Sequence, residues 1–249
     1  MPKAPKKLLA CLDSQLVERG LAADLREAKA LVMSGAVHSG DTKLLSSAAF
    51  LPLGLPLRIK GRGAAVSRAG AKLKAALSAW RLDLQGLNCL DVGASTGGFT
   101  QAMLKVGAAR VAAVELGTAQ LAQSLLRNAR VVSLERTDIR SLSLHRAGGP
   151  FDFAALDVSF LPLAEVLPAL RTLLKPGGAW IALVKPQFEA KVKQVPRGGV
   201  IRDGKLQTEL LDKVIAQARA LGLEPRASMA SPLKGIRGNQ EFLLLGQKI

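Results

Sequence analysis

The stretch Cys89-Leu-Asp-Val-Gly-Ala-Ser-Thr-Gly-Gly-Phe-Thr100 decides the fold of this chain. Its first residues, up to Val92, form an apolar run typical of a strand buried in a parallel sheet. The glycines that follow permit close backbone approach, and residues Phe99 to Val106 read as a helix that ends at Gly107. The sequence therefore predicts a loop at the carboxyl end of a strand, where open α/β sheets bind their ligands.

A carboxylate lies one strand further along the chain, where an acid can accept hydrogen bonds from ribose hydroxyls. Glu115 ends the next apolar run, which begins at Arg110. A dinucleotide site requires glycine at the position of Ser95, because a pyrophosphate nearly touches the backbone there. S-adenosylmethionine has no phosphate, so the pattern favours that cofactor. An ordinary strand-to-helix turn explains the glycines alone, but it does not explain Glu115.

The charge balance indicates a polyanionic partner. The 249 residues include 35 Lys and Arg against 19 Asp and Glu, a net charge of +16. With 49% apolar residues the chain can bury a core and form one large or two modest domains. It has no apolar stretch of membrane-spanning length and no signal-peptide pattern, so we expect a cytoplasmic protein. Two cysteines and two histidines are too few for a metal cluster, and no metal is expected.

We expect a small domain at residues 1–60, a linker at 61–66 and a second domain at 67–249. In the first, residues 8–19 have helical periodicity, and Asp24 with Glu27 has the spacing of a capping box that begins a second helix. Short extended runs follow at 36–38 and 57–60. Arg26 and Lys29 lie on one face of the second helix, which by itself indicates only a solvated surface.

This first domain resembles an S4-type RNA-binding domain. The resemblance rests on Leu12 to Leu21, Arg26 to Ala30 and Ser34 to Gly40, and it implies that Arg26 and Lys29 contact RNA. Two positions depart from the family pattern, because Cys11 replaces a common arginine and Leu25 a common serine.

After the linker, the chain alternates between apolar strand-like runs and helical segments. This alternation predicts an α/β fold with a mostly parallel sheet and right-handed crossovers. We place strands at 88–92, 110–115, 131–134, 152–156, 179–184, 226–230 and 241–245, and helices at about 70–80, 99–106, 118–127, 162–174 and 206–221.

Two polar side chains end strands of this predicted sheet at the same edge as the glycine-rich loop. Asp157 follows the fourth strand and Lys185 follows the fifth. Lys72 lies on the helix that enters the sheet, and Glu241 precedes the last strand. Each of these residues alone is more often structural, so their combination carries the prediction of a site.

From Val66 to Leu245 the chain resembles the TlyA family, also called hemolysin A proteins, which join an S4 domain to an FtsJ-like methyltransferase domain. The matching stretches are Ser67–Leu73, Asp91–Thr100, Leu156–Phe160, Val184–Glu189, Gly198–Asp203, Ser231–Gly235 and Gly238–Phe242. The resemblance implies a Rossmann-like class I methyltransferase sheet and an enzyme that methylates a 2′-hydroxyl of ribosomal RNA. It also implies a catalytic Lys-Asp-Lys-Glu tetrad at Lys72, Asp157, Lys185 and Glu241.

These residue types suit methyl transfer, in which the enzyme aligns an already activated donor with a nucleophile and helps remove one proton. We expect Lys185 to act as base or hydroxyl-orienting group with Asp157 as its partner, and Lys72 and Glu241 to position RNA. The residues expected to bind the cofactor are Asp91, Gly93, Ala94, Ser95, Thr96, Gly97, Gly98, Phe99, Glu115 on the ribose and Asp138 near the adenine. Asp138 is equally well explained as a cap of the next turn.

The segment between Lys185 and Asp203 is rich in basic residues and glycine, as in a mobile loop that grips phosphates. The side chains expected to bind RNA are Arg26, Lys29, Arg68, Lys191, Lys193, Arg197 and Arg202. Two other function classes stay open, a non-catalytic RNA-binding or ribosome-assembly factor and, less well supported, a membrane-active hemolysin. We expect a monomer.

Overall fold

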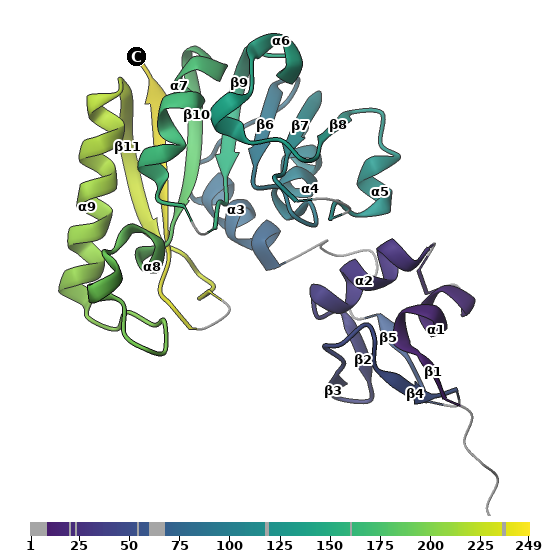
Figure 1. The fold of residues 1–249 in the computed structure, drawn as a ribbon. Helices are drawn as coiled ribbons and strands as arrows, with labels where there is room; N and C mark the ends of the chain where they lie inside the picture. Colours follow the sequence, from purple (N-terminus) through teal and green to yellow (C-terminus); the bar gives the residue numbers. More distant parts are fainter. Residues whose placement is uncertain are drawn as a thin grey trace, which may run out of the picture.

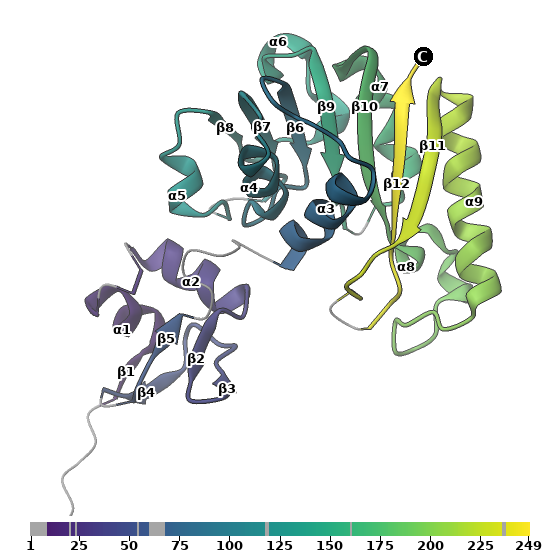
Figure 2. The same ribbon diagram turned by 180° about the vertical axis from the view of Figure 1, so that it is seen from behind.

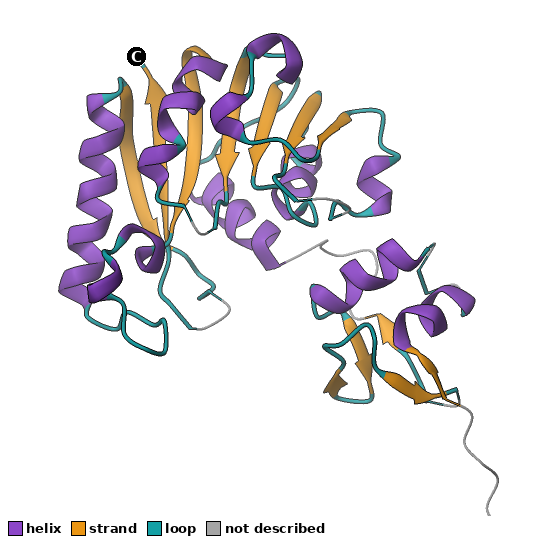
Figure 3. Ribbon diagram, in the orientation of Figure 1, coloured by secondary structure: helices purple, strands orange, loops and turns teal. Residues whose placement is uncertain are grey.

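The computed structural model describes residues 9–19, 21–22, 24–53, 55–59, 68–117, 120–159, 161–235 and 238–249. Its main feature is a seven-stranded sheet (Figures 1 and 3). The strands are β6 (Asn88–Val92), β7 (Arg110–Val114), β8 (Val131–Leu134), β9 (Phe151–Leu156), β10 (Leu174–Val184), β11 (Leu223–Ala230) and β12 (Phe242–Lys248). They lie in the order β11-β12-β10-β9-β6-β7-β8.

The central strands of this sheet are parallel. β6 pairs in parallel with both β7 and β9, β7 pairs in parallel with β8, and β9 pairs in parallel with β10. β12 is antiparallel to both of its neighbours, β10 and β11. The chain runs outward from β6 in one direction and from β9 in the other, so the strand order reverses between them. Such a switch point is where open α/β sheets bind ligands.

Helices cover both faces of the sheet (Figures 1 and 2). One face packs on α3 (Arg68–Ala79), α4 (Gly98–Lys105) and α5 (Gln123–Leu126), which contribute Leu73, Phe99 and Leu125 to one apolar core. The other face packs on α6 (Leu144–Ala147), α7 (Leu167–Leu173) and α9 (Gly204–Ala220) around a second core. A short helix, α8 (Pro186–Glu189), follows β10 directly.

Close packing explains why this core has glycine at position 246, beside Trp180. Trp180 on β10 is fully buried, and a Cβ at Gly246 on β12 would lie 2.2 Å from its ring carbon Cζ2. Only glycine leaves room for this indole. Burial of such a side chain contributes about 1.5–3 kcal/mol to folding, so β12 is held to β10 by packing as well as by its ladder.

The N-terminal part of the chain has its own sheets and core. Its elements are β1 (Leu9–Cys11), α1 (Leu12–Glu18), α2 (Leu25–Met33), β2 (Val37–Ser39), β3 (Thr42–Lys43), β4 (Phe50–Pro52) and β5 (Arg58–Ile59). β1 pairs with β4, and β2 lies between β3 and β5. The side chain of Asp24 caps α2 by accepting a hydrogen bond from Glu27 N at 2.8 Å, as predicted. The core consists of Leu12, Leu16, Ala22, Ala28, Val32 and Val37.

The helix predicted over residues 8–19 is confirmed for Leu12–Glu18, but its start was predicted wrongly. Leu9–Cys11 form a strand because they pair with Phe50–Pro52, about forty residues away, and this tertiary ladder overrides the local helical pattern. The proposed linker at 61–66 lies outside the described residues.

Several element boundaries after residue 68 also differ from prediction, and among the strands β11 begins at Leu223 rather than 226 and β12 ends at Lys248 rather than 245. α5 is confined to Gln123–Leu126, and the segment expected as one helix at 162–174 divides into a 3-10 turn at Leu163–Glu165 and α7. β10 begins at Leu174 rather than 179, with a register shift against β9. Pro176 and Gly177 are residue types typical of turns, so the sequence did not indicate a strand here. In the structure Gly177 has a positive φ.

Candidate active site

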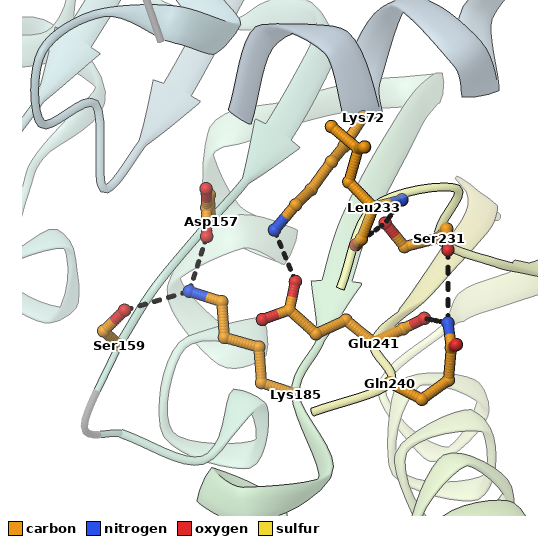
Figure 4. A network of polar contacts seen from close by, with 8 residues as sticks. All are labelled: Lys72, Asp157, Ser159, Lys185, Ser231, Leu233, Gln240 and Glu241. Atoms are coloured by element: carbon orange, nitrogen blue, oxygen red, sulfur yellow. Dashed lines mark hydrogen bonds and ion pairs between the residues drawn. The ribbon is translucent and has the colours of Figure 1, made fainter. Parts of the chain in front are cut away.

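The sheet topology brings four predicted site residues to one edge. Asp157 follows β9, Lys185 follows β10, and Glu241 immediately precedes β12. Val184 pairs with Phe242 in the antiparallel ladder, so the next residues in that register are Lys185 and Glu241. Lys72 reaches the same place from α3 (Figure 4).

These four side chains form two buried ion pairs. Lys72 Nζ lies 2.5 Å from Glu241 Oε2, and Lys185 Nζ lies 2.5 Å from Asp157 Oδ1 (Figure 4). None of the four side chains is more than 17% exposed. Removing charges from water is costly, and a well-packed apolar pair is often at least as stable. Two such pairs at the ligand-binding edge of a sheet therefore indicate a functional site.

Lys185 has a third contact that the sequence analysis missed. Its Nζ donates a hydrogen bond to Ser159 Oγ at 2.9 Å, and it lies 5.8 Å from the ring centroid of Phe188. The available signal was the position of Ser159, two residues after Asp157 in the matched motif. An amine nitrogen has four tetrahedral positions. One is its bond to Cε and two face Asp157 and Ser159, so one remains for a ligand.

The loop before β12 holds Glu241 in place. Ser231 N donates to Glu241 O at 2.8 Å, and Gln240 Nε2 donates to the carbonyl oxygens of Ser231 and Glu241 (Figure 4). A Cβ at Gly235 would lie 2.5 Å from Glu241 Oε1. The glycine therefore allows the loop to fold tightly over the carboxylate.

Asp91, at the carboxyl end of β6, is the most strongly perturbed acid of the site. It is fully buried, and its Oδ2 accepts hydrogen bonds from Thr100 N at 2.7 Å and Thr100 Oγ1 at 2.6 Å. Its Oδ1 has no partner within the described part of the chain. Burial raises the pKa of Asp91 to about 7, against the opposing effect of the Thr100 hydrogen bonds. An unpartnered buried oxygen is uncommon, and a donor on a bound ligand is one way to satisfy it.

The glycine-rich loop is built around the backbone of Asp157. Gly93 has a φ of +80°, and a Cβ there would lie 2.6 Å from Asp157 O. Gly97 has a φ of +93° and faces Leu125, and Ser95 has a φ of +47°. Of the other predicted loop residues, Ala94, Gly98 and Phe99 are buried, and Thr96 O accepts a hydrogen bond from Ala122 N.

The two remaining acids predicted to bind the cofactor have protein partners. Glu115 Oε2 accepts from Ser95 N at 2.9 Å, and its Oε1 accepts from Gly117 N at 2.8 Å, so this carboxylate holds the tip of the loop. Asp138 caps a 3-10 turn and pairs with Arg140, whose hydrogen bonds and charge lower the pKa of Asp138. The capping alternative therefore describes Asp138 in this structure, and its contact with adenine stays a prediction.

The predicted RNA-binding residues do not lie together. Arg26 on α2 pairs with Glu135 after β8 at 2.5 Å, and Lys29 is exposed. The Arg68 side chain lies outside the described part of the structure. The remaining basic residues of this set are all exposed, in the segment between α8 and α9: Lys191, Lys193, Arg197 and Arg202.

This basic segment, predicted as a mobile loop, is anchored by a residue that the sequence analysis missed. Asn239 is buried, donates to Gly199 O at 2.8 Å and accepts from Ile201 N at 3.0 Å. The signal was its place in the matched stretch Gly238–Phe242. Asn239 therefore fastens the basic segment to the loop that carries Glu241.

Two classes of feature are absent from the described residues. No helix there combines the length and apolarity needed to cross a membrane. No group of three or more His, Cys, Asp and Glu side chains in those same ranges could hold a metal ion.

Comparisons with known proteins agree with this architecture. The family model for FtsJ-like methyltransferases matches residues 65–248. The chain is 40% identical to the 16S/23S rRNA (cytidine-2′-O)-methyltransferase TlyA of Mycobacterium tuberculosis, over 94% of this chain and 88% of that protein. A solved structure of a candidate hemolysin from Streptococcus thermophilus is 36% identical, with a TM-score of 0.75 over 97% of this chain and 89% of that one. An S-adenosylmethionine-dependent methyltransferase from Mesorhizobium loti shares the fold, with 17% identity and a TM-score of 0.52 over 72% and 99% of the two chains.

Proposed function

Because the chain belongs to the TlyA family of FtsJ-like methyltransferases, we propose that it transfers a methyl group from S-adenosylmethionine to a ribose 2′-hydroxyl of ribosomal RNA. The observation that carries this proposal is the pair of buried ion pairs, Lys72–Glu241 and Lys185–Asp157, beside the glycine-rich loop. A protein that only held RNA would gain little from burying four charges at that edge.

The residues of the loop fit the cofactor. S-adenosylmethionine, when bound, supplies an activated methyl group on a sulfonium and carries a positively charged amino group. The unpartnered Oδ1 of Asp91 is a buried acceptor suited to such a donor. Gly93 and Gly97 leave the loop free of side chains where a Cβ would collide with the protein. Glu115, next to Ser95, is placed to exchange its backbone partners for ribose hydroxyls.

Lys185 is the residue that would handle the substrate hydroxyl. Asp157 Oδ1 and Ser159 Oγ occupy two directions around its Nζ and fix where the third points. As a neutral amine, Lys185 would donate to both partners and accept the 2′-OH proton through its lone pair as the C–O bond forms and the bond between the methyl carbon and the sulfonium sulfur breaks. As an ammonium, it would only orient the hydroxyl oxygen through its third N–H. The neighbouring pair of Lys72 and Glu241 would position the RNA.

The remainder of the chain supplies the RNA affinity. The net charge of +16 is large for 249 residues and favours a polyanion in sequence-independent binding. We propose that the N-terminal part, residues 1–60, is an S4-like RNA-binding domain joined through 61–66 to the methyltransferase domain at 67–249. We further propose that the protein acts as a monomer on ribosomal particles in the cytoplasm.

The test is transfer of a labelled methyl group from S-adenosylmethionine to free ribosomal RNA, isolated subunits and whole ribosomes. We expect label in RNA with the parental chain and a loss of at least about 100-fold with Lys185→Ala, the usual contribution of a positioned acid or base. Lys175→Ala is the matched control, because Lys175 forms a similar pair with Asp152 at the opposite end of β10. Equal activity of all three proteins would overturn the assignment of Lys185.

A second outcome would favour a different function. If the parental chain binds S-adenosylmethionine but labels no RNA, the ribosome-assembly reading gains support. Haemolysis by purified protein that Lys185→Ala leaves unchanged would separate a membrane activity from the proposed chemistry.

A further inference from the structure

An open cavity of about 530 Å³ lies beside the candidate active site, between the basic segment and the loop before β12. Its size is in the range of small-molecule sites. The residues that line it come mostly from two stretches whose roles the proposed chemistry leaves open: Val200, Ile201, Arg202, Gln207, Lys234, Gly238 and Gln240.

The walls of this cavity are held by hydrogen bonds. Asn239 ties Gly199 and Ile201 on one wall to the loop on the other. Gln207, from the first turns of α9, donates from Nε2 to Ile201 O at 2.7 Å. These hydrogen bonds hold Gly199, Ile201 and Gln207 in place beside the loop before β12.

Two glutamines present acceptors to a ligand. Gln240 Nε2 is committed to the carbonyl oxygens of Ser231 and Glu241, and Gln207 Nε2 to that of Ile201. These carbonyls accept only, so they fix which end of each amide is the oxygen. Among the described residues, the hydrogen bonds of both side chains use Nε2, and none uses either Oε1. Both amides line the cavity, which therefore favours a ligand that carries an N–H donor such as an exocyclic amine.

The same cavity has a cationic side. Arg202 and Lys234 both line it and are both exposed. No carboxylate among the described residues forms an ion pair with Arg202, and its planar guanidinium can bind a phosphate through two N–H groups.

The cavity adjoins the tetrad directly. Gln240 lines it, and the next residue, Glu241, pairs with Lys72. The cavity therefore lies one residue along the chain from the tetrad, close enough for the two to contact neighbouring parts of one bound RNA strand.

We propose that this cavity is a binding site for a nucleotide next to the methylated one. Arg202 and Lys234 bind its phosphate, and the Oε1 atoms of Gln207 and Gln240 accept hydrogen bonds from the exocyclic amine of its base. Cytosine offers such an amine, whereas uracil of the same size offers a carbonyl oxygen there. This inference rests on the proposed function for its ligand class, and it makes the cavity a determinant of sequence context.

The probes are cytidine 5′-monophosphate and uridine 5′-monophosphate. Their binding to the full chain is measured by NMR titration, with excess S-adenosylhomocysteine present to keep both probes out of the cofactor pocket. We expect cytidine 5′-monophosphate to bind about tenfold more tightly, toward the lower end of what base contacts contribute. Arg202→Gln should weaken both nucleotides about tenfold or more. The matched control Arg171→Gln, on α7 at the opposite edge of the sheet, should change neither.

The base contact is tested through the ratio of the two affinities. Gln207→Met should bring this ratio near one while Arg202 still binds the phosphate. Gln240→Met is the second variant, in case loss of the Ile201 contact perturbs the fold. The proposal is overturned if the parental chain binds the two nucleotides equally, or if Arg202→Gln and Arg171→Gln behave alike. Selective, Arg202-dependent binding without any methyl transfer to RNA would uphold the cavity and count against the proposed function alone.

Discussion

The buried carboxyl of Asp91 predicts a pH dependence of folding that one substitution removes. Its pKa in the folded protein is about 7, compared with 3.8 for a free aspartate, and burial is the main cause. Between these pH values the folded protein retains a proton that the unfolded chain has released. The free energy of unfolding therefore falls as pH rises from about 4 to about 7, and this contribution is constant above that range.

The magnitude follows from the pKa. At about 1.4 kcal/mol per pH unit, a pKa that moves from 3.8 to about 7 costs the folded state about 4 kcal/mol once Asp91 is ionised. About 3 kcal/mol of this cost develops between pH 5 and pH 8. An asparagine at position 91 accepts the Thr100 hydrogen bonds through its carbonyl oxygen and does not titrate. The free energy of unfolding of Asp91→Asn should therefore rise by about 3 kcal/mol relative to that of the parental chain between pH 5 and pH 8.

The assay is urea unfolding of both proteins at pH 5, 6, 7 and 8 with reductant present. Asp152→Asn is the control. Burial is the largest single effect on Asp152 and raises its pKa, but the hydrogen bonds from Lys175 and from Asn88 N and the charge of Lys175 together lower it, so Asp152 stays ionised throughout that range. The difference in free energy of unfolding between Asp152→Asn and the parental chain should be independent of pH. The reasoning is refuted if the difference in free energy of unfolding between Asp91→Asn and the parental chain is also independent of pH. Asp91→Asn should also lose binding of S-adenosylhomocysteine, whose positively charged amino group we expect to meet the free Oδ1.

Three further predictions follow from contacts. Gly93→Ala should cost about 1–3 kcal/mol of stability in urea unfolding, because of its positive φ and the 2.6 Å approach to Asp157 O; parental stability would contradict this packing. Asn239→Ala should also cost about 1–3 kcal/mol of stability and speed protease cleavage of the 191–203 segment, since it leaves the buried N–H of Ile201 and the partly buried carbonyl of Gly199 without their partner. Unchanged cleavage would show that other contacts anchor the segment. The Arg26–Glu135 pair is partly exposed, so a double-mutant cycle on unfolding should give less than about 1 kcal/mol of coupling, and a value above about 2 kcal/mol would contradict this.

The sequence predicted much of the larger sheet because the signals there are local. A buried parallel strand is a short apolar run, and a glycine-rich loop after it needs residues that tolerate positive φ. Cys89–Thr100 shows both patterns within twelve residues, and β6 and α4 lie within one residue of their predicted bounds. The places of Asp157 and Lys185 follow from the same rule, because the ends of parallel strands meet at one edge.

The individual side-chain contacts of the site could not be predicted from the sequence. The sequence placed Lys72 and Glu241 near one site through a family resemblance, but their ion pair joins residues 169 positions apart and depends on how α3 meets the loop before β12. Ser159 and Asn239 carry ordinary polar side chains, and only their partners, Lys185 and the 199–201 backbone, give them a role. β1 formed against a local helical pattern for the same reason.

The sequence by itself thus determined the strand-and-helix order, the glycine-rich loop and the excess of positive charge, since each depends on neighbouring residues or on composition. The tertiary structure alone decided which charges pair, which carboxylate oxygen of Asp91 lacks a partner, and that a cavity lies beside Glu241. The physical reason is that burial and ion pairing depend on tertiary contacts between segments that are distant in the sequence. Local sequence patterns do not specify those contacts.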